Sequence, residues 1–376
     1  MRGPALLALA LLLVVGPACC ARHPGDLQTQ LMLSSGLNGL LSDRSSLADP
    51  LVADLGLPAA AQDQQQEPLA NPAVHTLFSA DSAIGRRAAR ASLQRPEKSA
   101  GFDPVKAAKL AQLQSISYCA ALDDVANWNC TRCAQLPDFE PYLVHFDASW
   151  DLLGYIGYWP SMGAKVIVFR GTDSSSWYNW AENMRAWRTD ATYPVDGAPP
   201  ALRLHSGFLI LWNSSSMAST FHAAFGELLK LHPRGPTYVL GHSMGGALAH
   251  LAALDLQIMY GLQDVKVYTF GSPRVGNSVF SEFFSQKVSE SWRFTHGRDI
   301  VPSVPPQLLG FRHVSREVWL VDVDDGPAGV QQRIVVCDDT GEDPSCHNAA
   351  CRLGLCTSVA DHLVYMGAHM YRGGEC

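Results

Sequence analysis

The fold is decided by one stretch of the sequence, Thr237-Tyr238-Val239-Leu240-Gly241-His242-Ser243-Met244-Gly245-Gly246-Ala247-Leu248-Ala249. It begins as a short apolar run typical of a β-strand, breaks at Gly-His-Ser-Met-Gly, and continues as an Ala- and Leu-rich run typical of a helix. A Gly-x-Ser-x-Gly motif between strand and helix is typical of a nucleophile elbow, which presents its serine on a sharp, strained turn. The residues two places before and after the serine come close together there, which requires glycine at 241 and 245. The alternative is a Gly-rich connection without a catalytic role, but the flanking elements favour the elbow.

The composition limits the possible partners. The chain has 376 residues, of which 47% are hydrophobic, so it can bury a large core. Its formal net charge is −7. No basic surplus is available to meet phosphates, so we expect no nucleic-acid partner.

The N-terminus has the pattern of a secretory signal peptide. Arg2 precedes an apolar run at 5–15, and small residues follow at 18–21. The run is too short to span a bilayer. We therefore expect residues 1–21 to be removed, the protein to be secreted, and no transmembrane segment to be present. Lipid modification of Cys19 is the alternative.

Residues 22–98 differ in composition from the rest of the chain. Gln and Ala recur and aromatic residues are nearly absent, as in Ala61-Gln62-Asp63-Gln64-Gln65-Gln66. Such a segment buries little apolar surface and orders poorly alone. We interpret it as a pro-segment, cut near Arg86-Arg87, with the catalytic domain at 99–376. The alternative is an N-terminal tail that is never removed.

Eight cysteines remain after removal of the signal peptide, and an even number in a secreted chain predicts disulfides. Cys130-x-x-Cys133 could instead indicate a redox or zinc site, but a thioredoxin-like unit and a second pair at finger spacing are both missing. The sequons at Asn129 and Asn213 are expected glycosylation sites.

Strands and helices alternate around the elbow, which predicts an α/β fold with a sheet that is parallel at its centre. Asp103-Pro104 has the pattern of a helix start, and the helix is expected to end by residue 120. A helix is also expected around Phe221, Phe225 and Leu228. The remaining expected elements are strands at 152–159, 165–170, 265–270, 292–295, 318–323 and 333–337, and a helix at 279–288.

An aromatic stripe follows the strand at 165–170. Trp177, Trp180, Met184 and Trp187 recur at intervals of three and four, which predicts an amphipathic helix. From its periodicity alone, this helix could be either an ordinary core-facing helix or a mobile lid.

A serine nucleophile needs a histidine base and a carboxylate that orients the base. In this fold the acid and then the histidine follow the serine along the chain, on loops after strands. Asp299 is the best-placed acid, because it directly follows a strand and precedes the rigid run Ile300-Val301-Pro302. Position favours His362 only slightly; the other histidines after Ser243 are at 250, 296, 313, 347 and 369.

The sequence resembles the fungal-type class 3 triacylglycerol lipases of the α/β-hydrolase fold over residues 100–376. The resemblance depends on seven segments in the same order, Phe169-Arg170-Gly171-Thr172, Asn179-Trp180, His205-Ser206-Gly207-Phe208, Gly241-His242-Ser243-Met244-Gly245-Gly246, Gly271-Ser272-Pro273-Arg274-Val275-Gly276-Asn277, Arg298-Asp299-Ile300-Val301-Pro302 and Asp361-His362-Leu363-Val364-Tyr365. It implies a mostly parallel central sheet with a short helical lid.

The resemblance also implies roles for individual residues. Ser243, Asp299 and His362 form the triad, and Thr172 and Met244 the oxyanion hole. Thr172 stands where family members often carry serine, so the hydroxyl is kept and the added methyl group narrows the pocket. The lid and its substrate contacts are carried over to Trp177, Trp180 and Met184. The implied disulfides are Cys119–Cys376, Cys130–Cys133 and Cys337–Cys346; Cys351 and Cys356 remain as a pair without a family counterpart.

These residues predict a secreted serine hydrolase that cleaves carboxylic esters, with triacylglycerol at an oil–water interface as the expected substrate. No metal or organic cofactor is needed, and a monomer that binds lipid transiently is expected. The alternatives are a phospholipase A1 or galactolipase, a feruloyl-type esterase, and a non-catalytic lipid-binding protein of the same fold. The intact serine, acid and histidine disfavour the last of these.

Overall fold

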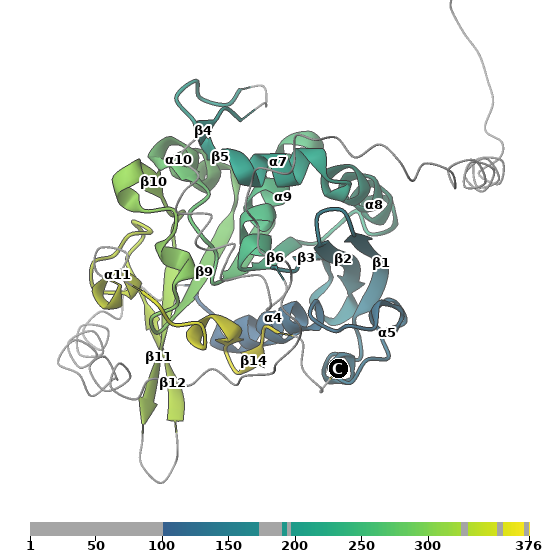
Figure 1. Cartoon of the computed structure of the whole chain (residues 1–376). Coiled ribbons are helices and arrows are strands. Elements are labelled where there is room, and N and C mark those ends of the chain that lie inside the picture. Colours follow the sequence, from purple (N-terminus) through teal and green to yellow (C-terminus); the bar gives the residue numbers. More distant parts are fainter. Residues whose placement is uncertain (1–100, 173–189, 194–196, 325–329, 352–355, 372–375) are drawn as a thin grey trace, which may run out of the picture. The chain divides into compact units, whose positions relative to one another are not determined.

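The structure is a computed structural model that describes residues 101–172, 190–193, 197–324, 330–351, 356–371 and 376. An eight-stranded sheet forms its centre, in the order β1-β2-β3-β6-β7-β9-β11-β12 (Figure 1). Its strands are β1 (Glu140–Asp147), β2 (Leu152–Trp159), β3 (Ala164–Phe169), β6 (Thr237–His242), β7 (Val265–Phe270), β9 (Glu290–His296), β11 (Glu317–Asp324) and β12 (Val330–Val336). The pairs from β3 to β11 are parallel, and antiparallel pairs extend the sheet at both ends. The expected α/β sheet with a parallel centre is confirmed.

Helices cover both faces of the sheet. They are α4 (Pro104–Ile116), α5 (Leu122–Ala126), α7 (Ser206–Ser214), α8 (Met217–Leu231), α9 (Met244–Tyr260), α10 (Ser278–Lys287) and α11 (His347–Ala350). Side chains of a strand alternate between the two faces of a sheet. Val239 accordingly packs among the side chains of α7, α8, α9 and α10. Its neighbours Tyr238 and Leu240 pack against α4 on the opposite face (Figure 1).

The parallel strands direct the site to one edge of the sheet. In register, Phe169 of β3 pairs with Gly241 of β6, which pairs with Thr269 of β7. The carboxyl ends of these strands therefore lie side by side. Ligand sites of open α/β sheets lie at this edge, where the loops after the strands meet.

Two helices differ from the prediction. Asp103 caps α4 as expected, since its carboxylate accepts hydrogen bonds from the backbone N–H groups of Val105 and Lys106 at 2.9 and 3.0 Å. However, α4 ends at Ile116 and not near residue 120. The helix expected around Phe221 is preceded by a separate helix, α7. The break falls at two serines, whose hydroxyls bond to the backbone and to Asp147 in place of helix continuation.

Short elements surround the carboxyl edge. A four-stranded sheet has the order β10-β8-β5-β4, and β13 pairs with β14. These strands are β4 (Asp190–Ala191), β5 (Leu204–His205), β8 (Gly276–Asn277), β10 (Phe311–Arg312), β13 (Val364–Tyr365) and β14 (Ala368–His369). The 3₁₀ turns are Cys133–Gln135, Pro160–Met162, Val301–Ser303, Gln307–Leu309 and Asp361–Leu363. Among the described residues, no helix is long and apolar enough to cross a membrane.

Candidate active site

Ser243 stands on the strained turn that the motif predicts. Its φ is 55° and its ψ −128°, a backbone conformation rare for a residue with a side chain. It lies between the end of β6 and the start of α9, and its N–H donates to the carbonyl of Phe270 on the neighbouring strand at 2.9 Å. A Cβ at Gly241 would lie 2.1 Å from the carbonyl oxygen of Gly245. The close backbone approach thus explains why both positions are glycine.

The strand end after β3 lies against the serine. A Cβ at Gly171 would come within 2.7 Å of the Cβ of Ser243. The next residue is Thr172, whose hydroxyl donates to the sulfur of Met244 at 3.6 Å. Met244 is the first residue of α9, so its N–H has no acceptor within the helix. The two residues expected to form the oxyanion hole are therefore neighbours, and both adjoin the elbow.

Asp299 and His362 come together from two separate loops. The carboxylate of Asp299 lies 2.8 Å from Nδ1 of His362, and both side chains are buried. The same carboxylate oxygen accepts a hydrogen bond from the hydroxyl of Tyr365, and the other oxygen accepts one from the N–H of Val301 at 2.9 Å. Carboxylate oxygens accept hydrogen bonds, so the proton of the His362 ring is on Nδ1. Nε2 is then the basic nitrogen of the ring.

Gly271 leaves room for this pair. It directly follows β7 and has a φ of +59°, and a Cβ there would lie 2.8 Å from the carboxylate of Asp299 and 2.9 Å from Cε1 of His362. The pair is thereby packed against the end of the strand beside β6. The ring of His362 also lies 4.5 Å, centroid to centroid, from the ring of His242, the residue before the nucleophile. The hydroxyl of Ser243 is buried and has no hydrogen-bond partner within the described part of the chain.

His242 links the residues after β3, the nucleophile elbow and the loop of His362. The hydroxyl of Tyr118 accepts from the N–H of Gly171 at 3.1 Å and lies 2.5 Å from Nδ1 of His242. Nε2 of His242 lies 2.8 Å from the backbone carbonyl of His362. Since a carbonyl needs a donor, Nε2 carries the proton and Nδ1 accepts from the tyrosine.

Burial, and then the neighbouring His362, hold the pKa of His242 well below its usual range, so it stays neutral. Sequence reasoning missed this chain of contacts. The only signal was that His242 stands next to the serine.

The rival candidates have structural partners. His296 lies 2.9 Å from the carbonyl of Asp361 and 3.0 Å from the carboxylate of Asp322. Although burial acts to lower it, the hydrogen bond and charge of Asp322 raise the pKa of His296. His313 binds the carbonyl of Pro302 at 2.8 Å, and His250 that of Gly246 at 2.6 Å.

Asp255 also follows Ser243 in the sequence, but its carboxylate accepts hydrogen bonds from the side chains of Tyr193 and Trp212. It lies in α9, in its second half and away from the elbow.

Within the described residues, four disulfides join Cys119 to Cys376, Cys130 to Cys133, Cys337 to Cys346 and Cys351 to Cys356. These are the three pairs that the resemblance implies and the pair that remained. Two groups in the described residues combine one His or Asp with two cysteines, but those cysteines are disulfide-bonded. A cysteine binds a metal ion as a thiolate, which a disulfide does not provide, so neither group is a metal site.

Asn129 and Asn213 are exposed, as glycosylation requires. The expected lid residues Trp177, Trp180 and Met184 lie outside the described residues, as do the expected signal peptide at 1–21 and pro-segment at 22–98.

Comparison with known proteins identifies the family. A family model described as lipase (class 3) matches residues 166–309. The lipase of Rhizomucor miehei is 32% identical over 260 residues, which cover 68% of this chain and 66% of that protein. Its solved native propeptide complex matches with a TM-score of 0.60 at 31% identity, over 70% of this chain and 80% of that one. This chain belongs to the fungal class 3 lipase family and has its α/β-hydrolase fold.

Two further similarities concern secretion and chemistry. Secreted mono- and diacylglycerol lipase 1 of Fusarium solani is 41% identical over 161 residues, which cover 42% of this chain and 46% of that protein. A solved structure titled as a serine protease triad forming the catalytic centre of a triacylglycerol lipase matches with a TM-score of 0.60 at 30% identity. That match covers 71% of this chain and 95% of the other. The chain spans less than two thirds of the length of the curated relatives it matches.

Proposed function

We propose that this protein is a serine hydrolase that cleaves the carboxylic esters of acylglycerols at a lipid surface, with Ser243, Asp299 and His362 as its triad. The observation that carries the proposal is the buried 2.8 Å contact between Asp299 and His362 beside a serine with positive φ. A strained nucleophile, an oriented base and a buried acid are the parts that acyl transfer through a serine requires.

The reaction follows from these positions. Nε2 of His362 takes the proton of the Ser243 hydroxyl as its oxygen attacks the ester carbonyl. Asp299 keeps the imidazole in the required tautomer and stabilises its protonated form. His362 then protonates the leaving glyceride oxygen, and the acyl group stays on Ser243. Water attacks this acyl-enzyme as His362 takes its proton, and the fatty acid departs as that proton returns to the oxygen of Ser243.

Thr172 and Met244 would stabilise the negative charge on the tetrahedral intermediate. The hydroxyl and N–H of Thr172 and the N–H of Met244 are the available donors. Removal of one such donor from a comparable site costs about 3–4 kcal/mol. Since both residues adjoin the serine from different strand ends, the fold itself sets the spacing of the donors.

Acylglycerols are the substrate class that the relatives' names support. The printed names are "Lipase" for the Rhizomucor miehei protein and "Secreted mono- and diacylglycerol lipase 1" for that of Fusarium solani. The aromatic stripe of Trp177, Trp180 and Met184 would form a lid over the acyl groove and expose apolar groups to lipid when open.

The same proposal includes secretion and processing. Four disulfides suit an oxidising compartment, and both sequons are exposed. Residues 1–21 would be the signal peptide and 22–98 a removed pro-segment. The mature enzyme would then be residues 99–376, a monomer that binds lipid transiently.

The test is the rate of hydrolysis of a short-chain triglyceride, measured through its solubility limit, with Ser243→Ala alongside. We expect a jump in rate when droplets appear and no rate for the variant. Smooth saturation without a jump would support the esterase activity but contradict gating by a lid. Phospholipid and feruloyl esters would then be tested next. An inactive wild-type protein, with residues 22–98 removed, would overturn the triglyceride proposal.

A further inference from the structure

A histidine that the proposed mechanism does not use binds the main chain of the catalytic acid. His347 is the first residue of α11, and its ring is buried. Its Nε2 lies 2.9 Å from the backbone carbonyl oxygen of Asp299. A carbonyl can only accept, so the proton is on Nε2 of His347 and the bond runs from the ring to the main chain of the acid.

His347 is neutral in this environment. Burial lowers the pKa of His347, although the charges of Glu317 and Asp299 act in the opposite direction. A buried neutral imidazole that loses its acceptor would pay the full cost of desolvation, so this contact is strongly favoured. The neutral ring carries one proton, and the bond to the carbonyl of Asp299 requires that proton on Nε2.

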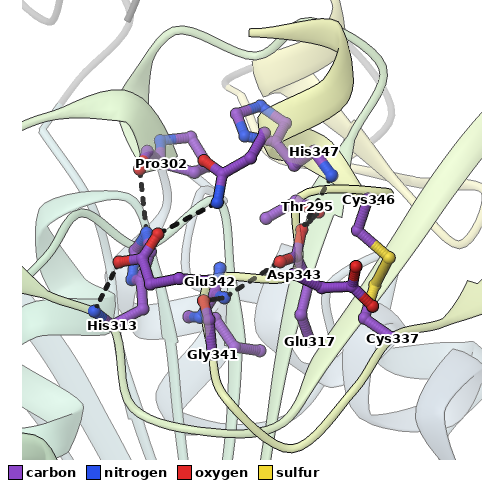
Figure 2. Close-up of polar contacts among 12 residues, drawn as sticks. Thr295, Pro302, His313, Glu317, Cys337, Gly341, Glu342, Asp343, Cys346 and His347 are labelled. Atoms are coloured by element: carbon purple, nitrogen blue, oxygen red, sulfur yellow. Dashed lines mark hydrogen bonds and ion pairs between the residues drawn. A yellow bond between two sulfur atoms is a disulfide. The ribbon is translucent and has the colours of Figure 1, made fainter. Parts of the chain in front are cut away.

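The main chain of His347 is fixed to the strand that leads to the acid. Its N–H donates to the carboxylate of Glu317 at 3.3 Å. The same carboxylate accepts from the hydroxyl of Thr295 at 2.7 Å and forms a buried ion pair with Arg293 at 3.2 Å. Thr295 and Arg293 lie on β9, which ends just before Asp299. The contacts thus close a ring from β9 through Glu317 and His347 back to the acid loop. Figure 2 shows the part of this ring from Thr295 through Glu317 to His347.

The segment that carries His347 is also restrained on both sides. Cys346 and Cys351 flank α11, and each is in a disulfide, to Cys337 and Cys356 respectively. Figure 2 shows the first of these disulfides next to His347 and Glu317. Beyond the second disulfide, Ser358 forms a β-bridge with Asp299, and the chain then reaches the catalytic histidine.

Glu342 also fixes the segment that carries His347. The carboxylate of Glu342 binds the guanidinium of Arg274 and the amide of Asn348, which directly follows His347. It also accepts a hydrogen bond from the N–H of His313 (Figure 2). Arg274 lies four residues after the end of β7, whose next residue, Gly271, packs against the acid. The helix that presents His347 is therefore tied to both strand ends that meet the triad.

We propose that His347 is a positioning residue for the catalytic acid: it holds the main chain of Asp299 so that the carboxylate faces Nδ1 of His362. This inference depends on the proposed function, because it concerns the same triad. If the hold is lost, the carboxylate no longer supports the protonated imidazole as well. The acidic limb of the pH–rate profile then shifts to lower pH, and kcat falls while KM for the ester changes little.

Two replacements of similar size separate a positioning role from a packing role. His347→Gln keeps an N–H donor near the position of Nε2, whereas His347→Met fills the space without a donor. We measure kcat, KM and the pH–rate profile on soluble p-nitrophenyl butyrate, with kcat expressed per serine labelled by a fluorophosphonate probe. We expect the methionine variant to lose ten- to a hundredfold in kcat with its acidic limb at lower pH, and the glutamine variant to regain most of both.

Lys165→Met is the matched control for lost stability. Lys165 is buried at the start of β3, at the edge opposite the triad, and its Nζ caps the carbonyls of His232, Arg234 and Gly235. Loss of these bonds should lower the melting temperature without moving the pH–rate profile. If the two His347 variants match each other and the wild type in kcat and acidic limb, or if they change only as Lys165→Met does, the inference is overturned.

Two further outcomes are separable. If His347→Met does not fold, the double variant Cys337→Ser/Cys346→Ser keeps the histidine but loosens its segment, because it removes the disulfide at the start of α11. The inference then predicts that this variant has a lower kcat and that the acidic limb of its pH–rate profile lies at lower pH. An unchanged profile overturns the inference. If the wild-type protein hydrolyses no ester at all, the proposed function fails. If the wild-type protein is active and the His347 variants are as active as it is, only the inference about His347 fails.

Discussion

The two sides of the candidate site are built by different means. On the side of the nucleophile, backbone meets backbone: glycines at 171, 241 and 245 allow approaches that no side chain would permit, and the serine takes a strained conformation between adjoining elements. On the side of the acid, the backbone is irregular, and buried side chains and disulfides hold it. The comparison teaches that a local motif can specify a nucleophile, whereas the acid depends on contacts from distant parts of the chain.

The largest expected effect comes from removal of the charge on the acid side. Asp299→Asn keeps the shape of the side chain but cannot stabilise the protonated imidazole, and its amide favours the wrong tautomer of His362. We expect kcat on a soluble ester to fall by about 10⁴-fold, which is roughly 5 kcal/mol in activation free energy.

The control for this variant is its thermal unfolding curve, which should stay within a few degrees of the wild type. A loss of tenfold or less in kcat, in a folded protein, would mean that another carboxylate supports the histidine. The acid side would then not be the specialised region that the comparison describes.

The difference between the two sides also explains what the sequence could predict. The elbow, the parallel sheet around it and the N-cap at Asp103 follow from neighbours within a few residues, and the structure has them. The contact partners of the acid are far away in sequence: His347 is 48 residues from Asp299, Tyr365 is 66, and Tyr118 is 124 residues from His242. No periodicity or spacing connects such residues, because only the folded sheet brings them together.

Position along the chain favoured His362 only slightly, and the assignment came from the resemblance to a family. The structure shows why position was insufficient. Histidines 296, 313 and 347 all lie near the same strand ends, and each binds a backbone carbonyl there. Among the histidines that the structure describes, His362 alone directs a ring nitrogen to a buried carboxylate that also accepts a hydrogen bond from Tyr365.

A methyl group at the elbow tests the steric side of the comparison. In Gly241→Ala, the new Cβ would lie 2.1 Å from the backbone carbonyl oxygen of Gly245, which cannot move without displacing α9. We expect the free energy of unfolding, measured by urea denaturation, to fall by about 3 kcal/mol or more, with activity lost.

Gly226→Ala is the matched control. Gly226 lies in α8, and its new Cβ would meet only the end of the Tyr260 side chain at 3.0 Å. Since alanine favours helix over glycine by about 1 kcal/mol, stability should be unchanged or slightly higher. Equal losses in both variants would show that the elbow has no special steric requirement.

Stability at low pH tests the buried polar contacts that hold the acid side. Although burial acts in the opposite direction, hydrogen bonds and charge from Arg274 lower the pKa of Glu342 from 4.5 to about 2. The carboxylate therefore binds protons more weakly when folded, so its contribution to stability is complete above pH 4.5 and is lost as the pH falls towards 2. We expect Glu342→Gln to lower the free energy of unfolding at pH 7 by roughly 2–3 kcal/mol, and the difference to shrink below pH 4.5.

Glu227→Gln provides the surface control for that experiment. Glu227 pairs with Lys230 at 2.7 Å, but both side chains are mostly exposed, and such pairs contribute about 0–1 kcal/mol. If the two variants lose the same stability at pH 7, or if the Glu342 difference persists to pH 2, the buried network does not hold the acid side as argued.

The smallest expected effect separates two kinds of support for one carboxylate. Tyr365 donates directly to the oxygen of Asp299 that faces His362, whereas His347 acts on the main chain. In Tyr365→Phe the carboxylate loses a donor but keeps its place, so more of its negative charge is available to the protonated imidazole. We expect kcat/KM to fall less than about tenfold, since one such bond contributes roughly 1 kcal/mol, and the acidic limb to move to higher pH. That direction is opposite to the one expected for His347→Met. A shift to lower pH in Tyr365→Phe would mean that the tyrosine, too, serves chiefly to hold the carboxylate in place, and the two supports would then be of one kind.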